Sequence, residues 1–397
     1  MKKDTQHFLN SPVTLRKLAL LLLLCIVNHG CHRNEADGNG SIQPVGVRLE
    51  MPHIEPLTLE RPLRVVATTS IIGDVAANVA KDAATVTTLM PRGHSPHSYS
   101  PTPKDVILLE DADIILVNGL GLEESLIPIL PKLKEVLIVP VSAGIEPASI
   151  LGGNDEHAEH DEHAEHDEHA EHDGHAEHDE HAEHDGHAEH DGHAEHDEHA
   201  EHDEHAEHDG HAEHNEGDPH FWWSPLNVIS WTHTIAEAYS AADPEHRDVY
   251  EQNARDYVRQ LENLDAELRS IVKLLPEQNR QLLVDHAGIG YFAREYGFEV
   301  IGYLIPSISD QAESSVRHIA ALADVVREKN LKAIFVGESV GRGIQNLAAS
   351  LASAAGQPLR VIELLTGSLA LAGNRGDTYL DFIRHNTQMI VDGLSGE

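Results

Sequence analysis

Residues 243–275 read DPEHRDVYEQNARDYVRQLENLDAELRSIVKLL, and the architecture of the chain follows from this stretch. Apolar side chains recur in it at helical spacing, at Tyr250, Ala254, Tyr257, Leu261, Leu264 and Leu268. This pattern predicts an amphipathic helix with one buried face, which begins at Asp243-Pro244 and ends at about Leu275. At about 1.5 Å per residue, such a helix is a long rigid rod. We therefore expect residues 244–275 to be a linking helix between two larger parts.

Short β-branched runs alternate with helical patterns on the N-terminal side of the linking helix. Strands are predicted at 65–69, 85–90, 114–118 and 136–141, and helices at 72–81, 103–111 and 123–130. Ser224-Pro225, an N-cap residue followed by proline at the first helical position, begins a further helix to about Ala241. Alternation of this kind indicates a parallel sheet, so residues 62–243 are expected to form an N-terminal α/β lobe.

The same alternation returns after the linking helix, in residues 276–397. Strands are predicted at 281–284, 299–303, 333–336 and 360–364, and helices at 289–296, 312–328, 344–355 and 378–394. The predicted fold class is α/β, with two similar lobes that each hold a parallel sheet flanked by helices. About 300 residues outside the leader and the insertion are enough for two domains with cores of their own.

The N-terminus has the pattern of an export signal. Lysines and arginines precede the apolar run Leu18 to Val27, which is too short to cross a bilayer but matches a secretory h-region. Gly30-Cys31 follows, as in a bacterial lipoprotein signal, although ordinary cleavage stays open because Asn28 is not the aliphatic residue expected there. Cys25 leaves with the leader, so no internal disulfide is expected. We predict a signal peptide at 1–31, a lipidated Cys31 and a tether at 32–61.

A repeat of His-Ala-Glu-His-Asp-Glu/Gly fills residues 154–215 and holds 20 of the 32 histidines. It also holds 26 Asp and Glu residues and no Lys or Arg. The chain has a net charge of −39, so −13 remains outside the repeat. No basic patch suggests nucleic acid as a partner. Imidazoles and carboxylates bind transition metals, but a segment without apolar residues forms no core. We expect a disordered insertion that captures metal weakly above about pH 6.5, where imidazole is neutral, or that serves only as a solvated spacer.

Three histidines outside the repeat are the candidate metal ligands. His97 lies in a proline-rich loop after the predicted strand 85–90, and ligands collect at the carboxyl ends of parallel strands. His220 follows Asp218, which is expected to orient its ring, and His286 again follows a predicted strand. We expect the two lobes to hold one ion between His97, His220 and His286. Taken singly, each histidine also fits a surface turn or a hydrogen-bonded bystander.

With these motifs in view, the chain resembles the zinc and manganese receptors of ABC importers, over about residues 62–397. The matching stretches are Pro96-His97-Ser98-Tyr99-Ser100-Pro101-Thr102-Pro103, Asp218-Pro219-His220, Asp285-His286 with Tyr291-Phe292-Ala293 and Tyr296-Gly297, Phe335–Ser339, and Asp377-Thr378-Tyr379 with Asn386. The resemblance implies two α/β lobes on a rigid helix, metal in the cleft, and a permease with its ATPase as partners. A His-rich insertion before the second ligand is what zinc-specific members look like.

One ligand departs from the pattern of that family. Many members have an aspartate after the last strand, where this chain has Gly367. Glu338, Glu363, water or a histidine of the repeat remain as candidates for the fourth ligand. Three imidazoles favour zinc over manganese, which prefers oxygen ligands.

The resulting hypothesis is an exported, monomeric, high-affinity zinc receptor that delivers its ion to an ABC permease. The alternative is a periplasmic metal buffer or resistance protein in which the repeat is the main functional element. Catalytic zinc also uses three histidines. However, no general base stands out, and the sequence has no His-Glu-x-x-His helix, nucleophile elbow or phosphate loop, so we do not expect an enzyme.

Overall fold

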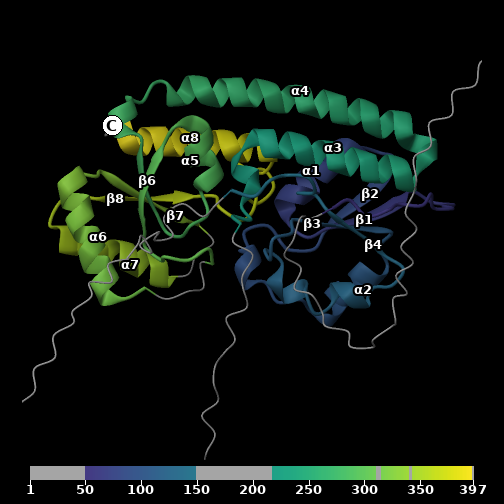
Figure 1. Ribbon diagram of the computed structural model, residues 1–397, viewed down its shortest axis with the longest axis horizontal. Coiled ribbons are helices and arrows are strands. Elements are labelled where there is room, and N and C mark those ends of the chain that lie inside the picture. Colours follow the sequence, from purple (N-terminus) through teal and green to yellow (C-terminus); the bar gives the residue numbers. More distant parts are fainter. Residues whose placement is uncertain (1–49, 149–216, 310–313, 339–341, 396–397) are drawn as a thin grey trace, which may run out of the picture. The chain divides into compact units, whose positions relative to one another are not determined.

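The structure of the protein is a computed structural model that describes residues 50–148, 217–309, 314–338 and 342–395 (Figure 1). The predicted signal peptide with Cys31 and the repeat at 154–215 lie outside the described residues. Within the described ranges, no helix is both long enough and apolar enough to cross a bilayer.

The N-terminal lobe is built on a four-stranded parallel sheet in the order β2-β1-β3-β4. Its elements are β1 (Leu63–Ala67), α1 (Ser70–Ala80), β2 (Ala84–Thr88), α2 (Pro103–Glu110), β3 (Ile114–Val117) and β4 (Leu137–Pro140). Thr69 is the N-cap of α1, and its hydroxyl oxygen accepts a hydrogen bond from the backbone N–H of Ile72. At the start of α2, the Asp105 carboxylate accepts hydrogen bonds from the N–H and the hydroxyl of Thr102.

The prediction of a helix at 123–130 is wrong. The chain forms two short 3₁₀ turns there instead, Glu124–Leu126 and Leu130–Lys132. Pro128 and Pro131 explain the difference, because proline lacks an N–H and its ring collides with the carbonyl four residues earlier in an α-helix.

The C-terminal lobe repeats the arrangement, with a parallel sheet in the order β6-β5-β7-β8. Its elements are β5 (Gln281–Val284), α5 (Gly290–Tyr296), β6 (Glu299–Tyr303), α6 (Val316–Lys329), β7 (Ala333–Gly337), α7 (Arg342–Ala355), β8 (Arg360–Leu364) and α8 (Tyr379–Ser395). The predicted fold class, two parallel α/β lobes, is therefore confirmed. The helix predicted at 312–328 corresponds to α6, and its predicted start at Ala312 lies outside the described residues.

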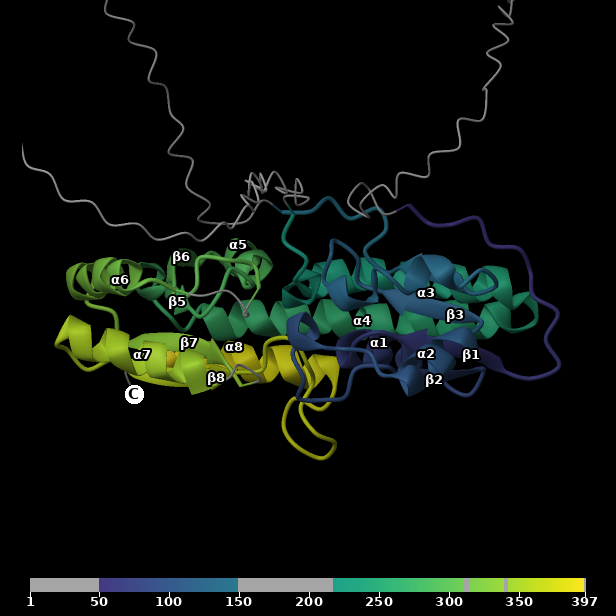
Figure 2. The same ribbon diagram turned by 90° about the horizontal axis from the view of Figure 1, so that it is seen from below.

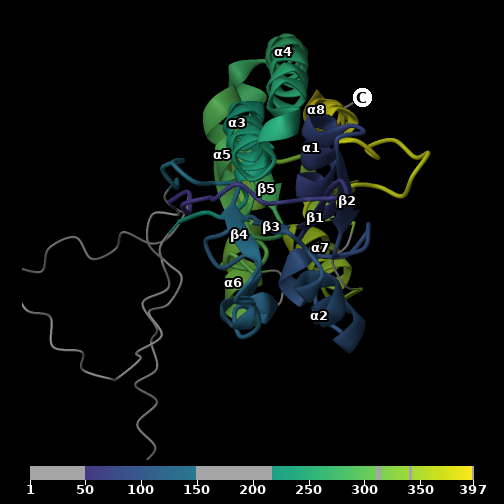
Figure 3. The ribbon, with the colours of Figure 1, turned by 90° about the vertical axis from the view of Figure 1, so that its right-hand side faces the viewer.

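The linking helix α4 (Arg247–Val272) runs past both sheets beside α3 (Pro225–Ala242), as Figures 1 and 3 show. It begins later than predicted, because Pro244–His246 forms a separate 3₁₀ turn. All six side chains of the predicted apolar stripe are buried. Tyr250 donates a hydrogen bond to the carbonyl of Ala83 in the N-terminal lobe, and Arg269 pairs with Glu295 in the C-terminal lobe. One helix thus fastens both lobes.

The two lobes share a core as well as a helix. The largest cluster of buried apolar side chains continues from β1 and α1 through α3 and α4 to α5 and α8. Figure 2 shows α4 running behind the elements of both lobes. Part of the predicted tether joins this core: Met51, Ile54 and Leu59 pack against it, and Leu57 donates its N–H to the carbonyl of Ala242 at 2.8 Å. The described part of the predicted tether, residues 50–61, is therefore packed against the fold.

Candidate metal centre

His97 is placed by the loop between β2 and α2, residues 89–102. Pro96–Ser98 forms one 3₁₀ turn, and the capped start of α2 at Pro103 fixes where the loop ends. Burial lowers the pKa of His97 well below its ordinary value, since it disfavours the charged ring, and the neighbouring rings of His220 and His286 lower it further. His97 is therefore a neutral imidazole at pH 7, which is the form that binds a metal.

His220 is held by the residues on either side of it. One oxygen of Asp218, Oδ1, accepts the backbone N–H of His220 at 2.9 Å and lies 2.8 Å from its ring Nδ1. Asn118 donates to the carbonyl of Pro219, between them, at 2.9 Å. Both His220 and Asp218 are 2% exposed. Since Nδ1 is bonded to the carboxylate, Nε2 is the nitrogen left to face the cleft.

His286 is held in the same way by the residue before it. Asp285 Oδ1 accepts the N–H of His286 at 2.8 Å and lies 2.9 Å from its Nδ1. Asp285 Oδ2 accepts the N–H of Gly337 at 2.7 Å, which ties the end of β5 to the end of β7. Burial acts to raise the pKa of Asp285, but the His286 ring and the N–H groups outweigh it and lower the pKa. Asp285 is therefore a carboxylate that orients a ring.

His97 and His286 both follow a strand, as predicted, but the two strands are not equivalent in the two sheets. His97 follows β2, an edge strand, whereas His286 follows β5, which corresponds to β1 in sheet order. Sequence alternation predicts that a strand is present but not its place in the sheet. The histidines nevertheless reach the same point, because the long loop between β2 and α2, residues 89–102, carries His97 toward the other lobe.

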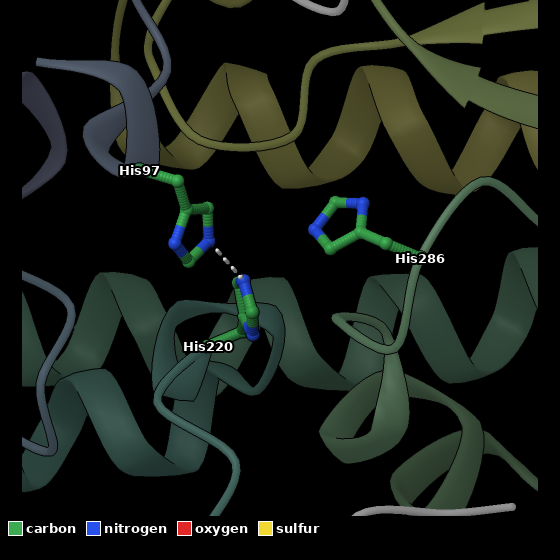
Figure 4. A group of neighbouring side chains, drawn as sticks. All are labelled: His97, His220 and His286. Atoms are coloured by element: carbon green, nitrogen blue, oxygen red, sulfur yellow. Dashed lines mark hydrogen bonds between the residues drawn. The ribbon is translucent and has the colours of Figure 1, made fainter. Parts of the chain in front are cut away.

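The three rings come together between the lobes (Figure 4). Their ligand atoms all lie within 4.8 Å of one another. His97 Nε2 and His220 Nε2 are 3.1 Å apart, and the ring centroids of the three pairs are 5.2, 5.3 and 6.0 Å apart. In the part of the chain that the structure describes, this is the one group of three or more His, Cys, Asp or Glu with metal-binding geometry.

Two glycines line the cavity beside the rings. A Cβ on Gly288 would lie 2.9 Å from His286 Nε2 and 3.1 Å from His220 Nε2, so the missing side chain is what leaves room between the two nitrogens. A Cβ on Gly367 would lie 2.5 Å from the Pro96 ring. The place assigned to the family's aspartate is therefore tightly packed here.

Glu338 and Glu363, two of the candidates for the fourth ligand, do not line the cavity. Both are exposed, and Glu363 accepts a hydrogen bond from Gln345. Glu363 precedes Leu364, whose side chain does line the cavity, and successive residues of a strand point to opposite faces. Water and a histidine of the repeat remain as candidates for the fourth ligand.

A segment of the C-terminal lobe is latched onto the loop that carries His97. Arg92 donates to the carbonyls of Ala370 and Asp377 at 2.8 and 2.5 Å. The hydroxyl of Ser368 accepts the N–H of Gly93 at 2.8 Å and lies 3.0 Å from that of Ser70. No pattern in the sequence indicated these contacts. The carboxylate of Asp285 was also missed, although the parallel between Asp218 before His220 and Asp285 before His286 was a usable signal.

Comparison with known proteins places the chain among metal-uptake proteins. The family model described as zinc-uptake complex component A, periplasmic, matches residues 65–393. The manganese-binding lipoprotein MntA of Halalkalibacterium halodurans is 27% identical over 335 residues, which cover 84% of this chain and 89% of the relative. The iron-binding protein YfeA of Yersinia pestis is 26% identical over 344 residues, 85% of this chain and 88% of the relative.

Solved structures agree with these relatives. The periplasmic zinc-binding protein TroA from Treponema pallidum has a TM-score of 0.64 at 26% identity, and the match covers 84% of this chain and 99% of that protein. A manganese-bound periplasmic metal-binding protein from Candidatus Liberibacter asiaticus has a TM-score of 0.61 at 25% identity, with 84% and 100% covered.

Proposed function

The chain belongs to the family of periplasmic component A proteins of zinc-uptake complexes, and from this premise we propose that it is a high-affinity zinc receptor. It is a metal-binding substrate-binding protein of an ABC importer that works outside the cytoplasm, and it is not an enzyme. Zinc as the cargo, and His97, His220 and His286 as its ligands, are the parts that we propose.

The observation that carries the proposal is the convergence of three imidazoles whose ring nitrogens lie within 4.8 Å. Zinc is bound at about 2.0–2.1 Å from imidazole nitrogen, so a small inward movement of the rings brings all three to bonding distance. Two rings are already oriented by carboxylates at Nδ1. Binding therefore requires little reordering of His220 and His286.

The choice of zinc rests on the chemistry of the donor atoms. The group of ligands among the described residues consists of three nitrogens, without a carboxylate. Zinc is well matched to imidazole, whereas manganese is favoured by carboxylate, carbonyl and water oxygens. The named relatives include manganese-binding and iron-binding proteins, so the family alone does not select the ion. The histidines of the repeat add a second preference for zinc.

The proposed mechanism is binding and release without reaction. The ion is held between the lobes, and a permease coupled to an ATPase removes it. Because α4 and a shared core join the lobes, we expect release through movement of the loops that carry His97 and the latch at Ser368, rather than through wide opening of a hinge.

Titration of a variant that lacks residues 154–215 tests the proposal. We expect one tight zinc site per chain and loss of several weak sites, with zinc preferred over manganese in competition. A chain that loses its tight site with the repeat, and shows only many similar weak sites, is a metal buffer instead. Elemental analysis of the same variant, purified without added metal, identifies the ion.

A further inference from the structure

The insertion at 149–216 leaves and re-enters the fold at adjacent points. The carbonyl of Ala148, the last described residue before it, accepts the N–H of Asp218 at 2.9 Å. Gly217 packs so closely that a Cβ there would lie 2.6 Å from the side chain of Pro147. In the sequence, 69 residues separate Ala148 from Asp218. Two backbone segments that are distant along the chain therefore lie side by side, directly before the ligand His220.

A single hydroxyl from the other lobe joins these two segments. Tyr291, the second residue of α5, accepts the N–H of Ala148 at 3.0 Å and donates its own proton to the carbonyl of Asp218 at 2.9 Å. The side chain is 1% exposed, and its ring packs against Phe221 with centroids 5.2 Å apart. Burial raises the pKa of Tyr291, so the hydroxyl keeps the proton that it donates.

Asp218 connects this hydroxyl to the metal centre. Its carbonyl accepts from Tyr291, and its carboxylate holds Nδ1 of His220. Bringing two chain segments together costs entropy that grows with the length of the intervening loop, so contacts at the base of a long insertion must offset it. Tyr291 also lies five residues after His286. The start of α5 is therefore connected to two of the three proposed ligands, to His286 along the chain and to His220 through Asp218.

We propose that the Tyr291 hydroxyl is a positioning group, a clasp that closes the base of the insertion and thereby keeps Asp218 and His220 in place. The clasp allows a long acidic, histidine-rich segment to be attached four residues before the proposed ligand His220 without loosening the site. This inference rests on the proposed function, since it concerns the ligand His220.

The test compares Tyr291→Phe in two backgrounds, the full chain and a chain in which a four-residue Gly-Ser linker replaces 149–216. In the full chain, loss of one buried hydrogen-bonding group is expected to weaken zinc binding at the tight site about tenfold. With the short linker, the covalent link holds the two segments together, so the expected loss is under about threefold. Tyr296→Phe is the matched control, because its hydroxyl is on the same helix but binds Asp265.

Hydrogen exchange supplies a readout that is independent of metal. The amide of Asp218 should exchange faster in Tyr291→Phe than in the parent, and only in the full chain. Equal effects of Tyr291→Phe in both backgrounds, whether large or absent, would overturn the clasp. If the proposed function itself is wrong, His97→Ala leaves zinc binding unchanged in both backgrounds, which is a different outcome from failure of the clasp.

Discussion

Replacing Gly288 by alanine is the sharpest test of where the ion sits. The new methyl carbon would lie 2.9 Å from His286 Nε2 and 3.1 Å from His220 Nε2, whereas ordinary contacts begin at 3.4 Å. The two rings must therefore retreat by about 0.5 and 0.3 Å, which exceeds the roughly 0.2 Å within which metal–ligand distances are held. We expect zinc affinity to fall about 100-fold, or about 2.8 kcal/mol, the upper end of the range for disturbed ligand orientation.

The fold is expected to tolerate this substitution. The backbone φ of Gly288 does not lie in the left-handed region, so alanine is allowed there. By lowering the entropy of the unfolded chain, alanine stabilises the folded state by about 0.4–1 kcal/mol. The assay is competition with a chelator of known affinity in the variant lacking 154–215, with thermal unfolding measured alongside. Gly343→Ala is the control, since a Cβ there meets nothing within 4 Å. A folded Gly288→Ala protein that binds zinc as tightly as its parent would show that the ion does not lie between these two nitrogens.

Two further predictions use the same chelator assay, and a third adds thermal unfolding of the metal-free protein at several pH values. Replacing His97, His220 or His286 singly by alanine should weaken the tight site by more than about 100-fold, and a triple variant that keeps it would place the site elsewhere. Asp285→Asn removes the carboxylate that orients His286, so we expect a loss of about 10- to 100-fold with one ion still bound; unchanged affinity would contradict that role. The pH dependence follows from His97, whose pKa is lowered in the fold by burial and by the neighbouring rings. Between that lowered pKa and about 6.5, the unfolded chain binds a proton that the folded chain does not, so the stability of the metal-free protein should fall as pH falls through 6.5. Tight binding should in turn persist below 6.5, where ordinary imidazoles lose metal, and equal pH midpoints for tight and weak sites would refute this.

The sequence was sufficient to predict elements whose pattern is local. The stripe from Tyr250 to Leu268 predicted α4, because a buried helix face repeats every three to four residues. The strand-helix alternation likewise predicted both parallel sheets. Errors arose where one residue type overrides a pattern, as Pro128 and Pro131 do after β3.

The sequence was sufficient to predict the candidate metal ligands but not the residues that pack around them. Histidines at strand ends and beside aspartates carry a chemical signal in the sequence. The closeness of Gly288 to two rings, of Gly367 to Pro96 and of Tyr291 to Ala148 depends on how two lobes meet. Contacts of this kind follow no periodicity along the chain, so nothing in a single sequence indicates them.

The helix that spans both lobes has a consequence for transport as a whole. Because α4 and the shared core join the lobes, we expect the receptor to present nearly the same surface to the permease whether it is empty or loaded. Empty copies then compete with loaded ones for the same docking site. Metal uptake is therefore expected to decline when the receptor is produced in large excess over the available metal. The amount of receptor then limits the rate of the importer.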